Sequence, residues 1–192
     1  MKDNLSRIVS SEAEQLILVN ADDTVSGSLD KASCHDGQGI LHRAFSLFIF
    51  DRRGRLLLQQ RSADKRLWPL YWSNSCCSHP RVGESMEQAT ERRLRDELNI
   101  RARLEFVYKF TYQASYETLG SEHELCWVYL GRVDQAVVAN RHEIAATRFL
   151  GVAELRQELA AVPNQFTPWF KLEWQRLENE HASILEQYRT PL

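Results

Sequence analysis

The segment Asn74–Pro80, with the sequence NSCCSHP, carries residues well suited to chemistry. Its second cysteine, Cys77, lies two residues before His79, so a thiol and an imidazole occur together in a short polar stretch that ends at a proline. Both groups can exchange a proton or bind a metal ion. Cys76 is the internal comparison, because adjacent side chains of an extended segment point in opposite directions.

Two carboxylates in a second segment are predicted to share one face of a strand. Strand side chains alternate with a period of two, so Glu122 and Glu124 point the same way. The residues that follow on that face are apolar: Cys126, Val128 and Leu130. Two carboxylates at the entrance to an apolar face favour a cation between them. The alternative is a solvated strand end beside a turn.

Three histidines, His35, His42 and His79, lie in three separate segments. Each one alone is more often a structural or exposed residue than a ligand. His42 is the most informative, because it begins one side of a predicted strand. Together with the two glutamates, the three imidazoles would give a five-ligand, near-octahedral site with room for water, and mixed nitrogen and oxygen ligands suit Mn, Zn or Mg. The remaining histidines are interpreted as surface or packing residues: His123, His142 and His181.

A helix is predicted over residues 85–98. Ser85 and Gln88 have the spacing of a capping box, and an apolar stripe follows at helical intervals: Met86, Thr90, Leu94 and Leu98. Arg93 and Glu97 fall on the side of this stripe. They form either an ordinary i,i+4 ion pair at the edge of a solvated face or a site in which Glu97 holds a metal ion and Arg93 holds an anion. Glu91, Arg92 and Arg95 are predicted to point away from the stripe.

This helix and the residues before it resemble a degenerate Nudix box, G-x5-E-x7-R-E-U-x-E-E-x-G-U, in which U is apolar. The chain retains the pattern at Glu84, Arg92, Leu94, Glu97 and Ile100. It departs from the pattern at Ser78, Arg93, Asp96 and Asn99. Nudix hydrolases use the glutamate that Arg93 replaces to gather metal ions. The altered box combined with NSCCSHP resembles the type I isopentenyl-diphosphate delta-isomerases.

The resemblance implies an α/β fold, a Nudix-like α/β/α sandwich with a mixed β-sheet in a single domain. It also implies interconversion of isopentenyl and dimethylallyl diphosphate in isoprenoid biosynthesis. In that reading Cys77 and Glu124 are the acid–base pair, Tyr112 hydrogen-bonds the glutamate, and Trp169 stabilises a carbocation by a cation–π contact. From spacing alone, Trp169 is merely a core aromatic of the last helix.

The resemblance also implies the ligand sets. The metal ligands are His35, His42, His79, Glu122 and Glu124, with Glu124 binding through one oxygen. The diphosphate contacts are Lys31, Arg61, Lys65 and Arg93. A second ion, Mg²⁺, bridges the diphosphate to Glu97 and the backbone carbonyl of Cys77, since magnesium commonly binds few protein carboxylates together with substrate phosphates.

Two other functions remain open at this point. A Nudix hydrolase of a nucleoside diphosphate derivative is the main alternative, and Arg93 argues against its multi-metal site. A non-catalytic metal-binding domain is the other, and it leaves Cys77 and Arg93 without a role.

Composition limits the partners and the cellular compartment that we expect for this protein. The chain has 192 residues, 43% hydrophobic and 26% charged, with a net charge of −2, which gives no reason to expect nucleic acid or a membrane surface as a partner. The polar start MKDNLSRIVSSEAEQ does not resemble a secretory signal. Four cysteines, at 34, 76, 77 and 126, form no zinc motif or disulfide framework, so a reducing cytoplasm is expected. A monomer and a homodimer are both compatible with the sequence.

Residues 1–14 are interpreted as a loose or partly helical lead, and residues 15–192 as the isomerase domain. Strands are expected at 15–19, briefly near 22–27, and at 40–50, 55–61, 102–116, 122–130 and 144–150. Residues 29–39 are expected to form a loop. Further helices are expected at 152–161 and from Pro168 onward, the latter with Trp169, Leu172, Leu177 and Ile184 on its packed face.

Overall fold

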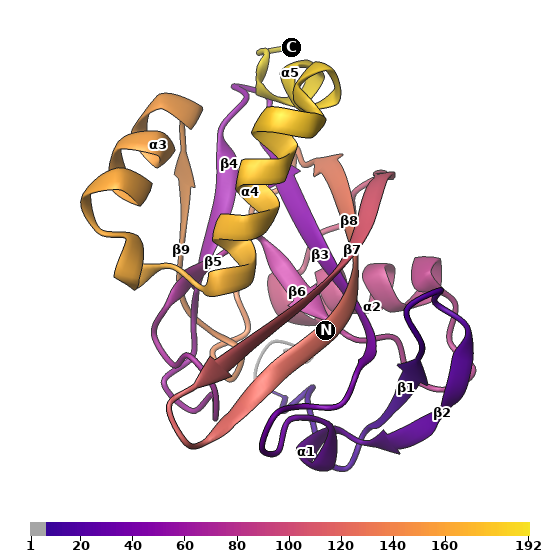
Figure 1. Cartoon of the computed structure of the whole chain (residues 1–192). Helices are drawn as coiled ribbons and strands as arrows, with labels where there is room; N and C mark the ends of the chain where they lie inside the picture. Colours follow the sequence, from indigo (N-terminus) through magenta and orange to yellow (C-terminus); the bar gives the residue numbers. More distant parts are fainter. Residues whose placement is uncertain (1–6) are drawn as a thin grey trace.

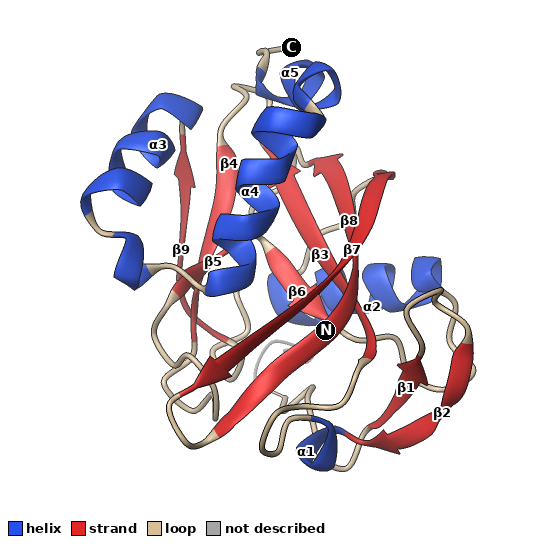
Figure 2. Ribbon diagram, viewed as in Figure 1, coloured by secondary structure: helices blue, strands red, loops and turns tan. Residues whose placement is uncertain are grey.

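One mixed sheet forms the centre of the computed structural model, which describes residues 7–192 (Figures 1 and 2). Its strands are β1 Gln15–Val19, β2 Val25–Asp30, β3 His42–Phe50, β4 Leu56–Arg61, β5 Trp72–Ser73, β6 Cys76–Ser78, β7 Leu104–Tyr116, β8 Gly120–Arg132 and β9 Ile144–Leu150. The helices are α1 Lys31–Cys34, α2 Met86–Leu98, α3 Val152–Ala161, α4 Pro168–Glu180 and α5 Ala182–Arg189. Pro163–Gln165 forms a 3-10 turn.

The two faces of the sheet bury different side chains because β3 alternates along its length. Ala44, Phe48 and Phe50 pack into the core beneath α3, α4 and α5. Phe45, Leu47 and Ile49 pack into a second core with Ala89, Leu94 and Leu98 of α2. Figure 2 shows α4 and α2 on opposite sides of the sheet. The predicted α/β/α sandwich with a mixed sheet is therefore confirmed.

The central strand β3 positions the site. It pairs in parallel with β8, and this register places His42 opposite Glu124. It also pairs antiparallel with β6, with Ser46 opposite Cys77. Three segments that are distant in sequence thereby bring an imidazole, a carboxylate and a thiol to neighbouring positions.

Three expectations about elements need correction. The loop predicted at 29–39 contains the short helix α1, whose first turn is capped by the Asp30 side chain. The last helix is two helices, because the chain leaves helical geometry at His181, whose ring stacks on Tyr108. Leu172 is 43% exposed, since the buried face of α4 is formed by Trp169, Phe170, Glu173, Trp174 and Leu177.

The N-terminal lead is only partly covered, because residues 1–6 lie outside the described residues. Residues 7–14 contain a turn and no helix. Backbone carbonyls of this segment accept hydrogen bonds from Arg93, Asn140 and Ala32. The domain boundary at residue 15 remains a prediction.

Gly120, at the tip of the β7–β8 hairpin, packs against the chain at His35. A Cβ on Gly120, which has φ of +152°, would lie 2.3 Å from the His35 carbonyl oxygen. Gly120→Ala is therefore expected to lower the free energy of unfolding by roughly 2–4 kcal/mol through strain and displacement of this contact. Chemical denaturation measures the change.

Gly37→Ala is the matched control, because Gly37 also has a positive φ, +56°, but open space around its added Cβ. It should cost only about 1–2 kcal/mol, the backbone strain alone. Equal losses for the two variants would contradict the proposed close packing at Gly120.

Candidate active site and metal centre

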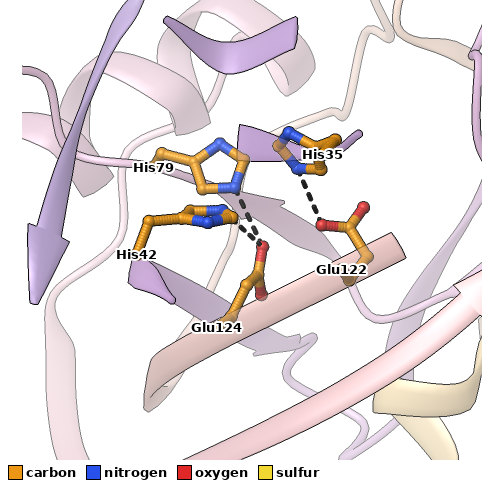
Figure 3. Close-up of side chains that lie close together, drawn as sticks. All are labelled: His35, His42, His79, Glu122 and Glu124. Carbon is orange, nitrogen blue, oxygen red and sulfur yellow. Dashed lines mark hydrogen bonds and ion pairs between the residues drawn. The ribbon is translucent and has the colours of Figure 1, made fainter. Parts of the chain in front are cut away.

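Five side chains from four parts of the chain converge at one end of the sheet (Figure 3). His35 caps the end of α1, His42 begins β3, His79 follows β6, and Glu122 and Glu124 share one face of β8. One ligand atom from each lies within 4.8 Å of all the others. The sequence predicted this same set.

Second contacts orient two of the imidazoles. Nδ1 of His35 lies 2.7 Å from the Lys31 carbonyl oxygen, and Nδ1 of His42 lies 2.7 Å from the Ile40 carbonyl oxygen. Because a carbonyl can only accept, both Nδ1 atoms carry the hydrogen and both Nε2 atoms face the cluster. Among the described residues, buried His42 Nε2 has no hydrogen-bond partner. An orphaned acceptor surrounded by imidazoles and carboxylates fits a divalent cation.

The ionisable groups of the cluster have pKa values that are shifted in opposite directions. Burial lowers the pKa of His42 to about 3, and burial also holds the pKa of His79 well below its usual value. His35 differs: burial disfavours its charge, but Glu122, 2.8 Å away, outweighs this and raises the pKa to about 9. Burial, and then Glu122, raises the pKa of Glu124 to about 7. A cation would relieve the crowding of the two carboxylates.

The two oxygens of Glu124 face different partners. Oε1 lies 2.9 Å from His79 Nε2 and 3.8 Å from His42 Nε2. Oε2 accepts a hydrogen bond of 2.7 Å from the Tyr112 hydroxyl. One oxygen is thus directed at the cluster while the other is held by a phenol, an arrangement that fixes the direction of the carboxylate.

A cavity of about 370 Å³ opens beside the cluster. Cys77, Tyr112, Glu124 and Trp169 all line it. Burial raises the pKa of the Cys77 thiol to about 12, so the thiol keeps its proton at neutral pH. Trp169 is 2% exposed, and the Arg61 guanidinium carbon lies 5.2 Å from the centre of its ring.

The four predicted diphosphate contacts also line this cavity: Lys31, Arg61, Lys65 and Arg93. Lys31 pairs with Glu12 at 3.4 Å, and Arg61 donates to the carbonyls of Trp68 and Leu67. A cavity lined by cations together with a thiol, a carboxylate and an indole suits an anion with an apolar tail.

Glu97 differs in position from the other predicted ligands. Its Oε1 accepts from Arg93 Nε at 2.7 Å and lies 3.3 Å from the Cys76 sulfur, and it is not among the described residues that line the cavity. Arg93 and Glu97 therefore form the i,i+4 pair, but on a buried face rather than a solvated one.

The sequence suggested that Arg92 lies on a free surface, but in the structure it does not. Its guanidinium donates to both oxygens of Glu84, at 2.6 and 2.8 Å, and to the His79 carbonyl. The retained box residues Glu84 and Arg92 thus fasten α2 to the segment that carries His79.

Sequence reasoning missed several residues of the cavity. Glu143 contacts two of the predicted cations, and Ser10 and His142 also line the space. Glu143 stands at the start of a strand with no motif around it. Its position beside the two cations could be found only from the tertiary fold.

Helix α4 carries a buried acid, Glu173. Glu173 is 0% exposed, and its Oε1 is 3.4 Å from the Cys126 sulfur. Burial raises the pKa of Glu173 to about 8, so the group holds a proton at neutral pH.

Comparison with known proteins agrees with this geometry. Residues 40–170 match the NUDIX domain. A protein of known structure from Deinococcus radiodurans superimposes with a TM-score of 0.64 over 78% of this chain and 90% of its own, at 24% identity. The MutT protein of Methanosarcina mazei gives a TM-score of 0.61 over 73% of this chain and 95% of its own, at 16% identity. Fold and site thus define a Nudix-fold protein with a group of possible metal ligands outside helix α2.

Curated relatives narrow the class. Isopentenyl-diphosphate Delta-isomerase 1 of Photorhabdus laumondii is 39% identical over 174 residues, 90% of this chain and 99% of that protein. Isopentenyl-diphosphate Delta-isomerase of Serratia proteamaculans is 45% identical over 157 residues, 82% of this chain and 87% of that protein. The chain belongs to the isopentenyl-diphosphate Delta-isomerase family.

The five-residue cluster should bind one divalent ion per chain. His42→Ala removes the most buried ligand and should weaken metal affinity at least about tenfold. Elemental analysis after gel filtration measures occupancy. His181→Ala is the control, because His181 stacks on Tyr108 and is outside the cluster. Equal occupancy in the two variants would contradict the site.

Glu173 should make stability depend on pH. Its pKa rises from 4.5 unfolded to about 8 folded, so its contribution is complete below pH 4.5 and is lost as pH increases toward 8. Glu173→Gln imitates the protonated acid. Relative to the unchanged chain, it should gain roughly 2–4 kcal/mol of unfolding free energy between pH 5 and pH 8. A difference that does not vary with pH would contradict a buried, titrating carboxyl.

Proposed function

We propose that this protein interconverts isopentenyl and dimethylallyl diphosphate, a step of isoprenoid biosynthesis. The observation that carries the proposal is the cavity that Cys77 and Glu124 both line, with Glu124 held by Tyr112 and by the histidine cluster. The reaction adds a proton to one carbon of an alkene and removes one from its neighbour. It therefore needs two aimed proton-transfer groups in one site.

Cys77 and Glu124 are the proposed acid–base pair. An alkene is a weak base, so the acid must be close and well directed, and the tertiary carbocation formed needs stabilisation. The Trp169 ring lies on the cavity wall, where its π face can stabilise positive charge. Tyr112 holds Oε2 of Glu124 and leaves Oε1 toward the cluster.

The histidines and glutamates of the cluster are proposed to hold one divalent ion, of which Mn, Zn and Mg are all compatible with the ligands. When bound, the ion supplies fixed positive charge beside Glu124 and tunes the acidity of its carboxyl group. The chain's own residues orient Glu124 and bind the rest of the substrate.

The diphosphate is proposed to contact Lys31, Arg61, Lys65 and Arg93. A Mg²⁺ ion accompanying it is proposed to reach Glu97 and the Cys77 carbonyl. The contacts of Glu97 with Arg93 and Cys76 both use Oε1, so Oε2 is the oxygen proposed to meet the ion.

Hydrolysis of a nucleoside diphosphate derivative is less favoured. Arg93 stands in the place of a Nudix glutamate, and its guanidinium fills the space between Glu97 and Glu143. The named relatives also point to isomerisation.

The proposed setting is the cytoplasm. Within residues 7–192, no helix has the length and apolarity that crossing a bilayer requires. A monomer or homodimer remains the prediction for the assembly.

The proposal is tested by incubating the protein with isopentenyl diphosphate and Mg²⁺ and following dimethylallyl diphosphate and released phosphate by NMR. Isomerised product without phosphate is expected. Cys77→Ala should reduce turnover by about 10²–10⁴-fold or more with metal content unchanged, because it removes one proton-transfer group.

Cys76→Ala is the matched control. Its sulfur is fully buried near Glu97, so the change should lower stability but retain most activity. Phosphate release by the unchanged chain, or equal losses of activity in the two variants, would count against the proposal.

A further inference from the structure

Glu143 lies where two cation-bearing segments meet. Its amide and that of Ile144 both donate to the Asn140 carbonyl, and the Asn140 amide donates to the Glu97 carbonyl at the end of α2. The Glu143 carbonyl accepts from the amide of Ser62, in the segment that carries Lys65. The backbone around Glu143 is thus fixed to both segments.

The Glu143 carboxylate contacts one cation from each segment. Its Oε2 accepts hydrogen bonds from the Lys65 ammonium and, at 3.1 Å, from the Arg93 guanidinium. The side chain is only 3% exposed. Burial alone would favour its neutral form, but Lys65 and then Arg93 lower the pKa of Glu143 to about 2. The carboxylate is therefore ionised throughout the physiological range.

A buried negative charge beside an anion site requires an explanation. Considered only as a source of field, Glu143 would repel a diphosphate, and its removal would improve binding. Considered as a geometric constraint, it holds two cations together that would otherwise repel each other, one of them on the flexible stem of lysine. Because Lys65 and Arg93 both contact the same oxygen, Oε2, the role of geometric constraint is favoured.

The contacts of Arg93 show which donors such a constraint leaves for a ligand. Nε and NH2 are held by Glu97 and Glu143. NH1 donates instead to the Val9 carbonyl and the Ser10 hydroxyl, from a segment whose Ser10 lines the cavity. A phosphate oxygen can replace these NH1 contacts while both carboxylates keep the guanidinium oriented.

We propose that Glu143 is a positioning residue of the diphosphate site, holding Lys65 and Arg93 at a fixed separation so that their remaining donors face the diphosphate. This inference rests on the proposed function for the identity of the substrate. Glu143 acts through the two cations and takes no part in proton transfer.

The test is Glu143→Gln, measured in two ways. Calorimetric titration with inorganic pyrophosphate gives Kd, and the isomerase assay gives KM and kcat separately. Positioning predicts that Kd and KM both increase about tenfold with kcat nearly unchanged, because the loss affects binding throughout the reaction. A decrease or no change in both constants would overturn the proposal, since that is the result expected from a field effect alone.

Asp23→Asn is the matched control. The Asp23 side chain is 5% exposed and also joins two cations, Arg43 at 2.7 Å and Lys109 at 3.0 Å, but does not line the cavity. Asn tolerates its positive φ of 65°. The control should lose stability while Kd and KM remain unchanged. An equal increase of both constants in the control would assign the effect to general destabilisation and overturn the inference.

Glu143→Asp covers the case in which the glutamine variant does not fold. Aspartate keeps the charge but is one methylene shorter, so it cannot keep both contacts, and KM should increase by a smaller factor. An unchanged KM would overturn the proposal.

If the unchanged chain forms no dimethylallyl diphosphate, the proposed function fails, yet pyrophosphate titration still tests Glu143. An active isomerase with unaltered Kd in both variants contradicts only the positioning role.

Discussion

The parallel pairing of β3 with β8 is the constraint on which the site depends. It sets His42 opposite Glu124, and every second residue along both strands then faces the same core. A register shift of one residue would turn His42 to the opposite face and separate it from the carboxylates. The shift would also exchange the two sets of β3 side chains, moving Phe48 and Phe50 into the core beside α2. Phe45, Leu47 and Ile49 would enter the core beneath α4, so the distinct packing of the two cores favours the observed register. The placement of His42 beside Glu124 thus depends on hydrophobic packing along β3 as well as on the polar contacts of the cluster.

Charge is buried here in linked groups, since an isolated buried ion is too costly to retain. Arg93, 2% exposed, is surrounded by Glu97, Glu143 and backbone or hydroxyl acceptors, so removing any one partner leaves the others unbalanced. At the histidine cluster the balance differs: His35 is a cation paired with Glu122, but Glu124 lies close to that second carboxylate, and His42 Nε2 has no hydrogen-bond partner among the described residues. The Arg93 group is balanced within the protein, whereas the histidine cluster could hold a divalent ion.

Much of this could be predicted from the sequence, because it depends on local periodicity and specific motifs. The capping box at Ser85 and Gln88, the alternation of β3 and the shared face of Glu122 and Glu124 follow from repeat lengths of 3.6 and 2 residues. What was missed depends on contacts between distant segments. Glu143 has no neighbouring pattern, Arg92 is partly buried by its pairing with Glu84, and the helix breaks at His181, whose ring stacks on Tyr108. Spacing fixes which face a residue occupies, but not what is packed against that face.

The replacement of a Nudix glutamate by Arg93 explains why the candidate metal centre lies away from α2. In the Nudix pattern carboxylates on this helix gather metal ions. Here the Arg93 guanidinium pairs with both Glu97 and Glu143, and Lys65 adds a second positive charge at Glu143, so both carboxylates are already paired with cations. The carboxylates that could bind a metal ion are instead Glu122 and Glu124 on β8, which lie close to three imidazoles. The same substitution adds a cation to the wall of the cavity. Arg93 therefore lines the same cavity as Cys77 and Trp169, while the possible metal ligands are contributed by other elements.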